Sequence, residues 1–228
     1  MKTVYLYDES TGEYLREYIA QASPVRQGEF IVPTHSTDIA PPLIADYWPV
    51  FQNGSWVNIR DYRGIVWEKS SGLSIEYDQL GDLPSHLTAI PKPDGFYKWA
   101  VDSWVVDLDA ARQSKSIELK SAAASAITAG LNSNVLGGAH SYPSTATDQQ
   151  NLNGLVTESL LPDSGDEYKF WCADSNGLWA RRVHTKLQIQ SLGKLFSAHV
   201  KNQQQHYESK LQLLSNAADI ETINAIEW

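Results

Sequence analysis

The most reactive side chains of this sequence are its single cysteine and its six histidines. Cys172 ends the apolar run Phe170-Trp171-Cys172, where a buried, inert thiol is a better explanation than a nucleophile. One cysteine can form neither an intrachain disulfide nor a paired-cysteine metal site. His199 and His206 lie seven residues apart on one face of a predicted helix. Two ligands without a nearby cysteine or spaced carboxylate are too few for zinc, so we expect no metal site.

The carboxylates and polar turns do not assemble a catalytic motif either. The sequence has no nucleophile elbow, no phosphate-binding or dinucleotide-binding loop, no zinc-protease motif and no visible pair of acids for glycoside cleavage. The run from Asp174 to Gly177 resembles part of a calcium loop but lacks the other ligands, so a tight turn explains it better. Asp107 and Asp109 stand at a predicted helix start, where the helix dipole favours acids. We therefore expect no catalytic residue, no cofactor and no enzymatic activity.

Tryptophan is the outlier in composition, with eight in 228 residues. Indoles offer large amphipathic surfaces that suit interfaces and sugar platforms as well as cores. Core packing is the simplest role for each one. Five of them compete for the interior of one small region, however, so we expect one or two to face a partner. These five are Trp48, Trp56, Trp67, Trp99 and Trp104.

The segment Asp61-Tyr62-Arg63-Gly64 lies between these tryptophans and has two interpretations. In the first it is a turn in which Gly64 supplies positive φ, and Asp61 and Arg63 form a local ion pair of little energy. In the second it belongs to a shared binding surface. The predicted partner-binding residues are therefore Trp48, Trp56, Asp61, Arg63, Trp67, Trp99 and Trp104.

Charge and hydropathy narrow the classes of partner. The net charge of −9 and the absence of a Lys/Arg cluster argue against nucleic acid, because phosphate backbones repel an acidic chain. No apolar run approaches the roughly 18–20 residues of a membrane span. The N-terminus lacks the apolar core of a signal peptide. We expect a protein that is kept in a cytoplasm or carried inside a larger particle.

The first 106 residues favour short strands and turns. A hairpin is predicted over residues 1–19 and an extended, proline-rich stretch over 20–46. Asn53-Gly54 between two apolar runs is a strong hairpin signal, and a further strand is predicted at 65–67.

An internal repeat links segments that begin at Pro41 and Pro91. Both contain prolines, an aromatic residue, a tryptophan, a short turn and a second tryptophan. The two tryptophans are eight residues apart in the first segment and five apart in the second. Because strand side chains alternate between faces, the two pairs are expected to differ in geometry.

From residue 107 onward the sequence pattern favours helices. Helices are predicted over 107–129, over 147–160 behind a capping box at Thr147, and from Thr185 onward, with a short capped helix at 219–228. Residues 131–146 favour loop or short strand, and Asn176-Gly177 predicts a hairpin. The long helix packs within its domain or on a partner, or alternatively self-associates as a coiled coil. Its apolar stripe consists of Leu187, Leu192, Phe196, Val200, Tyr207, Leu211 and Leu214.

These patterns predict the α+β class. Residues 1–106 form a β region of short hairpins, with a possible division into modules of about 1–80 and 81–106. Residues 107–228 form an α+β domain with one β-hairpin and a long C-terminal helix.

Several segments resemble proteins of tailed bacteriophages. The stretch from Trp48 through Trp56 to Gly64 is similar to a signature of tail fibre assembly proteins of phages and prophages. The prolines before it fit the N-terminal pattern of that family, and residues 80–84 with the second tryptophan pair resemble what usually follows.

The C-terminal half is similar to a domain of unknown function found in phage tail proteins. The matching parts are the stretch from Tyr142 to Asn151, the hairpin around Trp179 and the closing residues 219–228. Neither family brings catalytic residues with it.

The resemblance implies a tail protein that acts in the host cytoplasm during assembly. Three hypotheses remain open: a fibre assembly chaperone that is transient or retained on the virion, a permanent tail or baseplate component that links fibres, and a receptor-binding tip that contacts host glycans. No nucleic-acid or membrane partner is expected, and the oligomeric state stays open.

Overall fold

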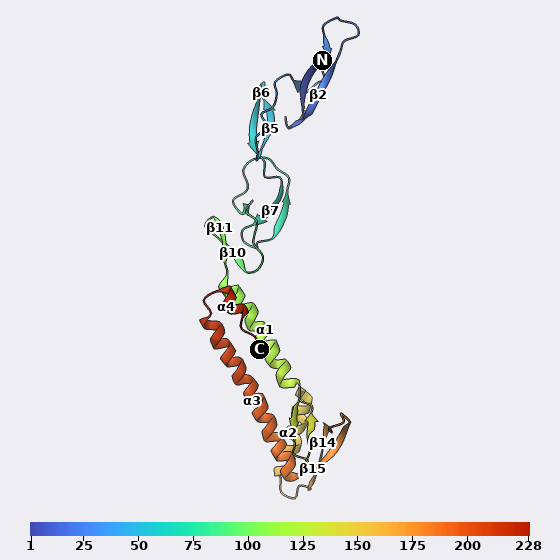
Figure 1. Cartoon of the computed structure of the whole chain (residues 1–228), viewed down its shortest axis with the longest axis vertical. Helices are drawn as coiled ribbons and strands as arrows, with labels where there is room; N and C mark the ends of the chain where they lie inside the picture. The colour runs from blue at the N-terminus through green and yellow to red at the C-terminus, as the bar shows by residue number, and fades with distance from the viewer. The chain divides into compact units, whose positions relative to one another are not determined.

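The computed structural model describes all 228 residues, which form two compact units, Met1–Val106 and Asp107–Trp228. Strands make up the first unit and four helices dominate the second (Figure 1). This mixture confirms the predicted α+β class.

The first unit consists of small antiparallel sheets with the strand orders β3-β2-β1-β4, β5-β6, β8-β7-β9 and β10-β11. Its strands are β1 (Lys2–Tyr7), β2 (Tyr14–Ala22), β3 (Phe30–Ile31), β4 (Ser36–Thr37), β5 (Tyr47–Gln52), β6 (Ser55–Arg60), β7 (Gly64–Glu68), β8 (Ser74–Tyr77), β9 (Leu87–Thr88), β10 (Tyr97–Ala100) and β11 (Ser103–Val106).

The predicted hairpins of this unit are confirmed. β1 pairs with β2 across a turn in which Asp8 accepts hydrogen bonds from the amides of Ser10 and Thr11, each at 2.9 Å. β5 pairs with β6 across Asn53 and Gly54, whose φ angles of 50° and 81° are those of the hairpin turn that Asn-Gly favours. The strands β8 and β9 were not predicted, because each has four residues or fewer and no clear alternation.

The internal repeat extends well beyond the two tryptophan hairpins. In residues 2–60 a hairpin (β1-β2) is followed by a short strand on the other side of its first strand (β4), then by the hairpin β5-β6. In residues 64–106 the same order recurs as β7-β8, β9 and β10-β11, without a counterpart of β3. We call these two segments the first and the second module. The expected division near residue 80 falls inside the sheet of the second module, since β7 pairs with β9 across it.

The two modules also share their hydrogen bonds. Each first hairpin closes on a bond from a glycine amide to an acidic residue's carbonyl, Gly12 to Asp8 at 2.9 Å and Gly72 to Glu68 at 2.8 Å. β4 and β9 each end on a threonine whose hydroxyl accepts a hydrogen bond from the amide two residues later. The pairs are Thr37 with Ile39 and Thr88 with Ile90. Such agreement in three successive elements indicates a structural duplication.

The second unit combines four helices with a four-stranded sheet of order β12-β13-β14-β15. The predicted hairpin is therefore the edge of a larger sheet. The elements are α1 (Leu108–Thr128), β12 (Leu131–Ser133), β13 (His140–Tyr142), α2 (Ala146–Leu160), β14 (Glu167–Ala173), β15 (Trp179–Thr185), α3 (Lys186–Asn216) and α4 (Ile220–Asn224).

Most predicted helix ends are confirmed by their caps. Asp107 caps α1, and Thr185 caps α3 in a capping box with Gln188. The α2 prediction needs correction, because the cap is Thr145 rather than Thr147. Asp148 supplies the acid at the third helical position, and this places the box two residues earlier.

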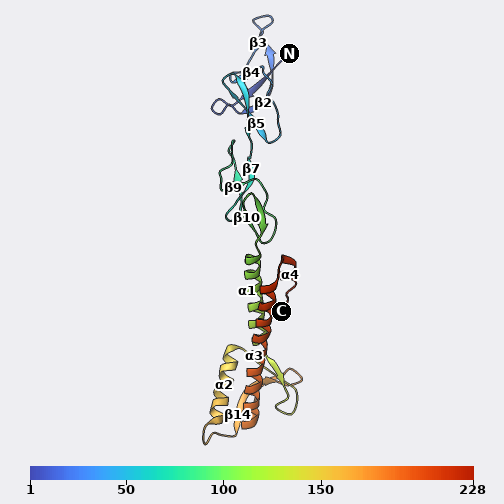
Figure 2. The same ribbon diagram turned by 90° about the vertical axis from the view of Figure 1, so that its left-hand side faces the viewer.

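α3 packs on α1, on α2 and on the sheet (Figure 2). Of the predicted apolar stripe, Leu192, Phe196 and Leu214 are buried, but Leu187 is 75% exposed. Ile189 takes its place because it lies three residues before Leu192 and so shares its face. Packing within the domain thus accounts for the buried part of the stripe.

Candidate interaction surface

The first unit exposes more large hydrophobic residues than it buries. Eighteen of its large hydrophobic residues are exposed, against eleven in the second unit. Sixteen hydrophobic residues are buried in the second unit, and fourteen of them form two core clusters. Only six aliphatic residues are buried in the first unit, namely Val4, Ala20, Pro49, Val50, Val66 and Leu87. Such an imbalance is typical of a surface that meets a partner.

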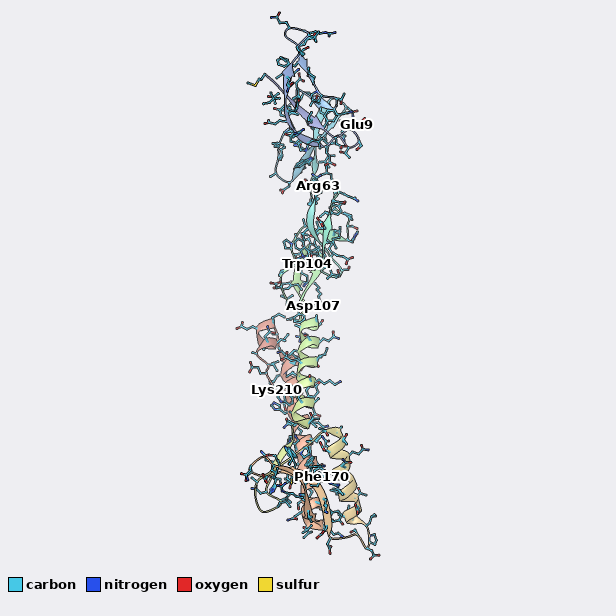
Figure 3. All side chains as sticks on the ribbon, turned by 90° about the vertical axis from the view of Figure 1, so that its right-hand side faces the viewer. Glu9, Arg63, Trp104, Asp107, Phe170 and Lys210 are labelled. Carbon is cyan, nitrogen blue, oxygen red and sulfur yellow. The ribbon has the colours of Figure 1, made fainter.

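Arg63 is the best-connected polar side chain in this unit (Figure 3). Its Nε and Nη2 donate to the two carboxylate oxygens of Asp61 at 2.9 and 2.8 Å, and its Nη1 donates to Glu13 Oε2 at 2.7 Å. The bidentate bond lowers the pKa of Asp61 and raises the pKa of Arg63. The ion pair is thus not only local, since Glu13 comes from the start of the chain.

Trp48 lies under the same guanidinium. The Arg63 Cζ atom is 5.0 Å from the centroid of the Trp48 ring, and the Trp48 indole donates to the Tyr14 carbonyl at 3.2 Å. The cluster of Glu13, Trp48, Asp61 and Arg63, which we call the arginine cluster, therefore joins the β1-β2 turn to the β5-β6 hairpin. Its three charged side chains keep 20–29% of their surface exposed.

A groove of about 370 Å³ adjoins this cluster. Its lining combines the charged residues of the cluster with apolar residues from β7 and the segment after β9. It is lined by Asp46, Arg60, Asp61, Tyr62, Arg63, Ile65, Val66 and Ala89. A shallow site with mixed charge and apolar surface suits contact with a protein chain.

Trp56 packs in an aromatic cluster instead. Its ring centroid lies 5.1 Å from that of Phe51 and 5.9 Å from that of Tyr14, with interplanar angles of 65° and 84°. Its indole N–H donates to the Ile39 carbonyl at 2.7 Å. Trp56 thus fills the small interior of the first module and anchors its proline-rich stretch.

The second module repeats this anchor. Trp104 donates to the Ile90 carbonyl at 2.9 Å, as Trp56 does to Ile39. Trp99 lies opposite Trp104 in the ladder, and their rings meet at 5.2 Å and 82°. In the first module the two tryptophans are not paired, because Trp48 lies opposite Ile59 and Trp56 opposite Phe51. The expected difference in geometry is therefore present.

The remaining predicted residue, Trp67, lies opposite Ser74 and Thr88 in the middle strand of its sheet. The structure thus brings Trp48, Asp61 and Arg63 together and pairs Trp99 with Trp104, while Trp56 and Trp67 lie elsewhere. All five tryptophans are partly buried.

The prediction missed several contributing residues. Glu13 carries no sequence signal for its role, because it is separated by 50 residues from Arg63. Lys69, whose ammonium lies 5.2 Å from the Trp99 ring centroid, was also missed. The most exposed indoles are those of Trp171 and Trp179 in the second unit, at 47% and 49%. Their alternation with buried residues along β14 and β15 was the signal that could have found them.

Of the candidate reactive residues in the second unit, Cys172 is buried, His199 is half-buried and His206 is exposed. Cys172 is fully buried, as predicted, and burial raises its pKa. His199 bonds the Ala126 carbonyl at 3.1 Å, whereas His206 meets the ring of Trp228. No group of three or more potential metal ligands occurs in the chain. No helix is both long and apolar enough to cross a membrane.

Comparison with known proteins shows to which family the chain belongs. Residues 110–227, more than half of the chain, match the family described as Domain of unknown function (DUF4376). This chain belongs to the DUF4376 family. No solved structure is significantly similar to it.

Curated relatives of this DUF4376 chain confirm the resemblance to tail fibre assembly proteins. The prophage tail fiber assembly protein homolog TfaR of Escherichia coli K12 is 33% identical over 113 residues, which are 48% of this chain and 58% of TfaR. The tail fiber assembly protein of Escherichia phage lambda is 32% identical over 113 residues, 48% of this chain and 57% of that protein. The chain thus spans less than two thirds of the length of these relatives.

Proposed function

We propose that this chain is a non-enzymatic phage tail protein that binds a tail fibre and assists its assembly. The observation that carries the proposal is the first unit, which exposes eighteen large hydrophobic residues and buries only six aliphatic ones. The names of the curated relatives support the same role. Fibre subunits expose apolar strand edges before they assemble, and a chaperone must cover such edges.

The arginine cluster and the groove beside it are the proposed centre of the contact. The cluster fixes the Trp48 face and the β1-β2 turn relative to each other, so that the surface is formed before binding. The five partly buried tryptophans are less suited to stacking sugars, because a sugar platform needs an open indole face. A protein partner therefore fits this unit better than a host glycan.

Co-expression of the full chain with the fibre protein encoded beside it tests the proposal. We expect a stable complex on size-exclusion chromatography and more soluble fibre than without the chain. Arg63→Ala should weaken the complex. The control is Arg16→Ala, which replaces an exposed arginine on β2 and should leave the complex intact. A fibre that folds equally well alone and does not co-elute with the chain would refute the role.

Retention on the finished particle is a separate part of the proposal. Mass spectrometry of purified virions should detect the chain in stoichiometric amounts if it stays on the fibre. Its absence from the virion, together with a complex during assembly, would establish a transient chaperone and exclude a permanent structural component.

A further inference from the structure

One edge of strand β14 in the second unit is open over most of its length. β13 pairs with β14 only through Ser141 and Ala173. Residues 167–172 therefore have no strand beside them on that side, although β15 pairs with all of them on the other. A strand edge without a partner offers a row of hydrogen-bonding groups to an extended chain.

The ladder shows which backbone groups of β14 point away from β15. A backbone bond of 3.2 Å runs from the Asp174 amide to the Leu178 carbonyl, so hydrogen-bonded pairs alternate from that point along β14 and β15. By this alternation the backbone groups of Lys169 and Trp171 point away from β15, toward the open side. Neither amide has a backbone partner elsewhere in the chain.

A depression of about 340 Å³ lies beside this edge. Lys169, Phe170 and Trp171 line it from β14, and Asn151 and Leu155 of α2 line it from the other side. Figure 3 labels Phe170, whose side chain belongs to the buried core under the edge. The space therefore combines free backbone groups with a wall of side chains.

Arg181 gives the depression a positive charge. Its guanidinium lines the depression and donates to the Lys169 carbonyl at 3.3 Å, the only hydrogen bond that it makes. The Lys169 ammonium and the Trp171 indole N–H have no partner within the chain. Glu167, at the start of β14, is the only acid that alternates onto the same face of β14 and β15. This face is locally cationic in a chain of net charge −9.

We propose that the open edge of β14 binds an extended, acidic segment of a partner protein as an added strand. The Lys169 and Trp171 amides pair with the backbone of the segment, while Arg181 and Lys169 hold its carboxylates. The half-exposed Trp171 ring covers an apolar side chain of the segment.

The charges favour a different protein over a second copy of this chain. Two copies paired through this edge would bring Lys169 and Arg181 of each against the same cations of the other, and like charges that face each other repel. This inference concerns residues 107–228 and does not depend on the role proposed for the first unit.

An end-capped hexapeptide of alternating glutamate and valine is the probe for this site. Added to the full ¹⁵N-labelled chain, it should shift the Lys169 and Trp171 amide signals and slow their hydrogen exchange by about fivefold or more. Arg181→Gln should weaken binding roughly tenfold, because a charge-assisted bond is lost. The matched control is Lys194→Gln, which replaces an exposed lysine on α3 and should leave the affinity for the peptide unchanged.

Three results would overturn the inference. Equal affinity for a hexapeptide in which lysine replaces glutamate would remove the charge complementarity. Equal affinity for a glutamate-valine peptide with N-methylated backbone amides would remove the strand pairing. Binding of an acidic oligosaccharide such as oligogalacturonate in place of the peptide, with the same loss in Arg181→Gln, would assign the site to a glycan instead.

Discussion

At the scale of single residues, Arg63 has the largest role in the first unit. It makes three side-chain hydrogen bonds to two carboxylates and covers an indole ring, with 29% of its side chain exposed. Sequence alone predicts the Asp61–Arg63 pair, because the two residues are close in the chain. The third partner, Glu13, depends on the packing of the β1-β2 turn on β5, where the Phe51 amide donates to the Gly12 carbonyl at 2.8 Å.

Replacement of Arg63 separates the structural from the binding role of the cluster. Arg63→Lys should lower the free energy of unfolding by about 1–2 kcal/mol, because an ammonium cannot reproduce the bidentate bond to Asp61. Urea denaturation measures this loss, and Arg16→Lys should stay within about 0.5 kcal/mol of wild type. An unchanged stability in Arg63→Lys would show that the cluster does not hold the hairpins together.

We expect His184 to make the stability of the second unit depend on pH. It is fully buried, and burial lowers its pKa below 6.5. Its Nδ1 lies 2.9 Å from the Arg182 carbonyl and must donate there, which leaves Nε2 to accept from the Tyr142 hydroxyl at 3.0 Å. His184 is therefore neutral in the folded state, whereas in the unfolded chain it takes up a proton near pH 6.5.

Acid should therefore weaken the fold before most carboxylates titrate. Stability is fully present above about pH 6.5 and falls as the pH drops from there toward 5, because only the unfolded state gains the proton. The lowered pKa values of Asp8, Asp61, Asp174 and Asp219 act below this window. Urea denaturation at pH 7 and pH 5 measures the difference in unfolding free energy between the two pH values. His184→Asn should lose much of this difference, whereas His206→Asn should retain it. An equal difference in both variants would contradict the assignment.

At the scale of elements, the sequence predicted those turns and helix caps that depend only on adjacent residues. The Asn53-Gly54 turn and the Asp107 cap of α1 each rest on a few adjacent residues, and the structure contains both. Strands of two to four residues, such as β8, β9 and β12, were missed or left open because pairing partners far along the chain define them.

The start of α2 tests a case in which two local signals compete. Thr145 and Thr147 both precede a plausible third-position side chain, but only Thr145 accepts from the Asp148 amide, at 3.2 Å. Thr145→Ala should cost about 1 kcal/mol of unfolding free energy, whereas Thr147→Ala should cost almost nothing. Chemical denaturation of the two variants measures this, and the reverse order of losses would move the cap back to Thr147.

At the scale of the whole molecule, the two units differ in what they bury. Residues 107–228 have two core clusters, whereas residues 1–106 repeat one small module twice around a few aliphatic residues. The sequence repeat of tryptophans indicated part of this duplication. Its full extent follows only from strand order and backbone bonds, because the first hairpins of the two modules share few residue types.

The same contrast predicts how the chain unfolds. Residues 107–228 expressed alone should fold and unfold cooperatively, since both of their core clusters lie within that range. Circular dichroism during thermal unfolding checks this. A fragment without a cooperative transition would show that its core requires the first unit.

The proposed contact with a tail fibre can be tested by hydrogen–deuterium exchange of the full chain, with and without the fibre protein encoded beside it. The fibre should slow exchange in the first unit, above all in β5-β6, β10-β11 and the segment Asp61–Gly64. Slower exchange confined to residues 107–228, or no change in residues 1–106 while the fibre is bound, would contradict it.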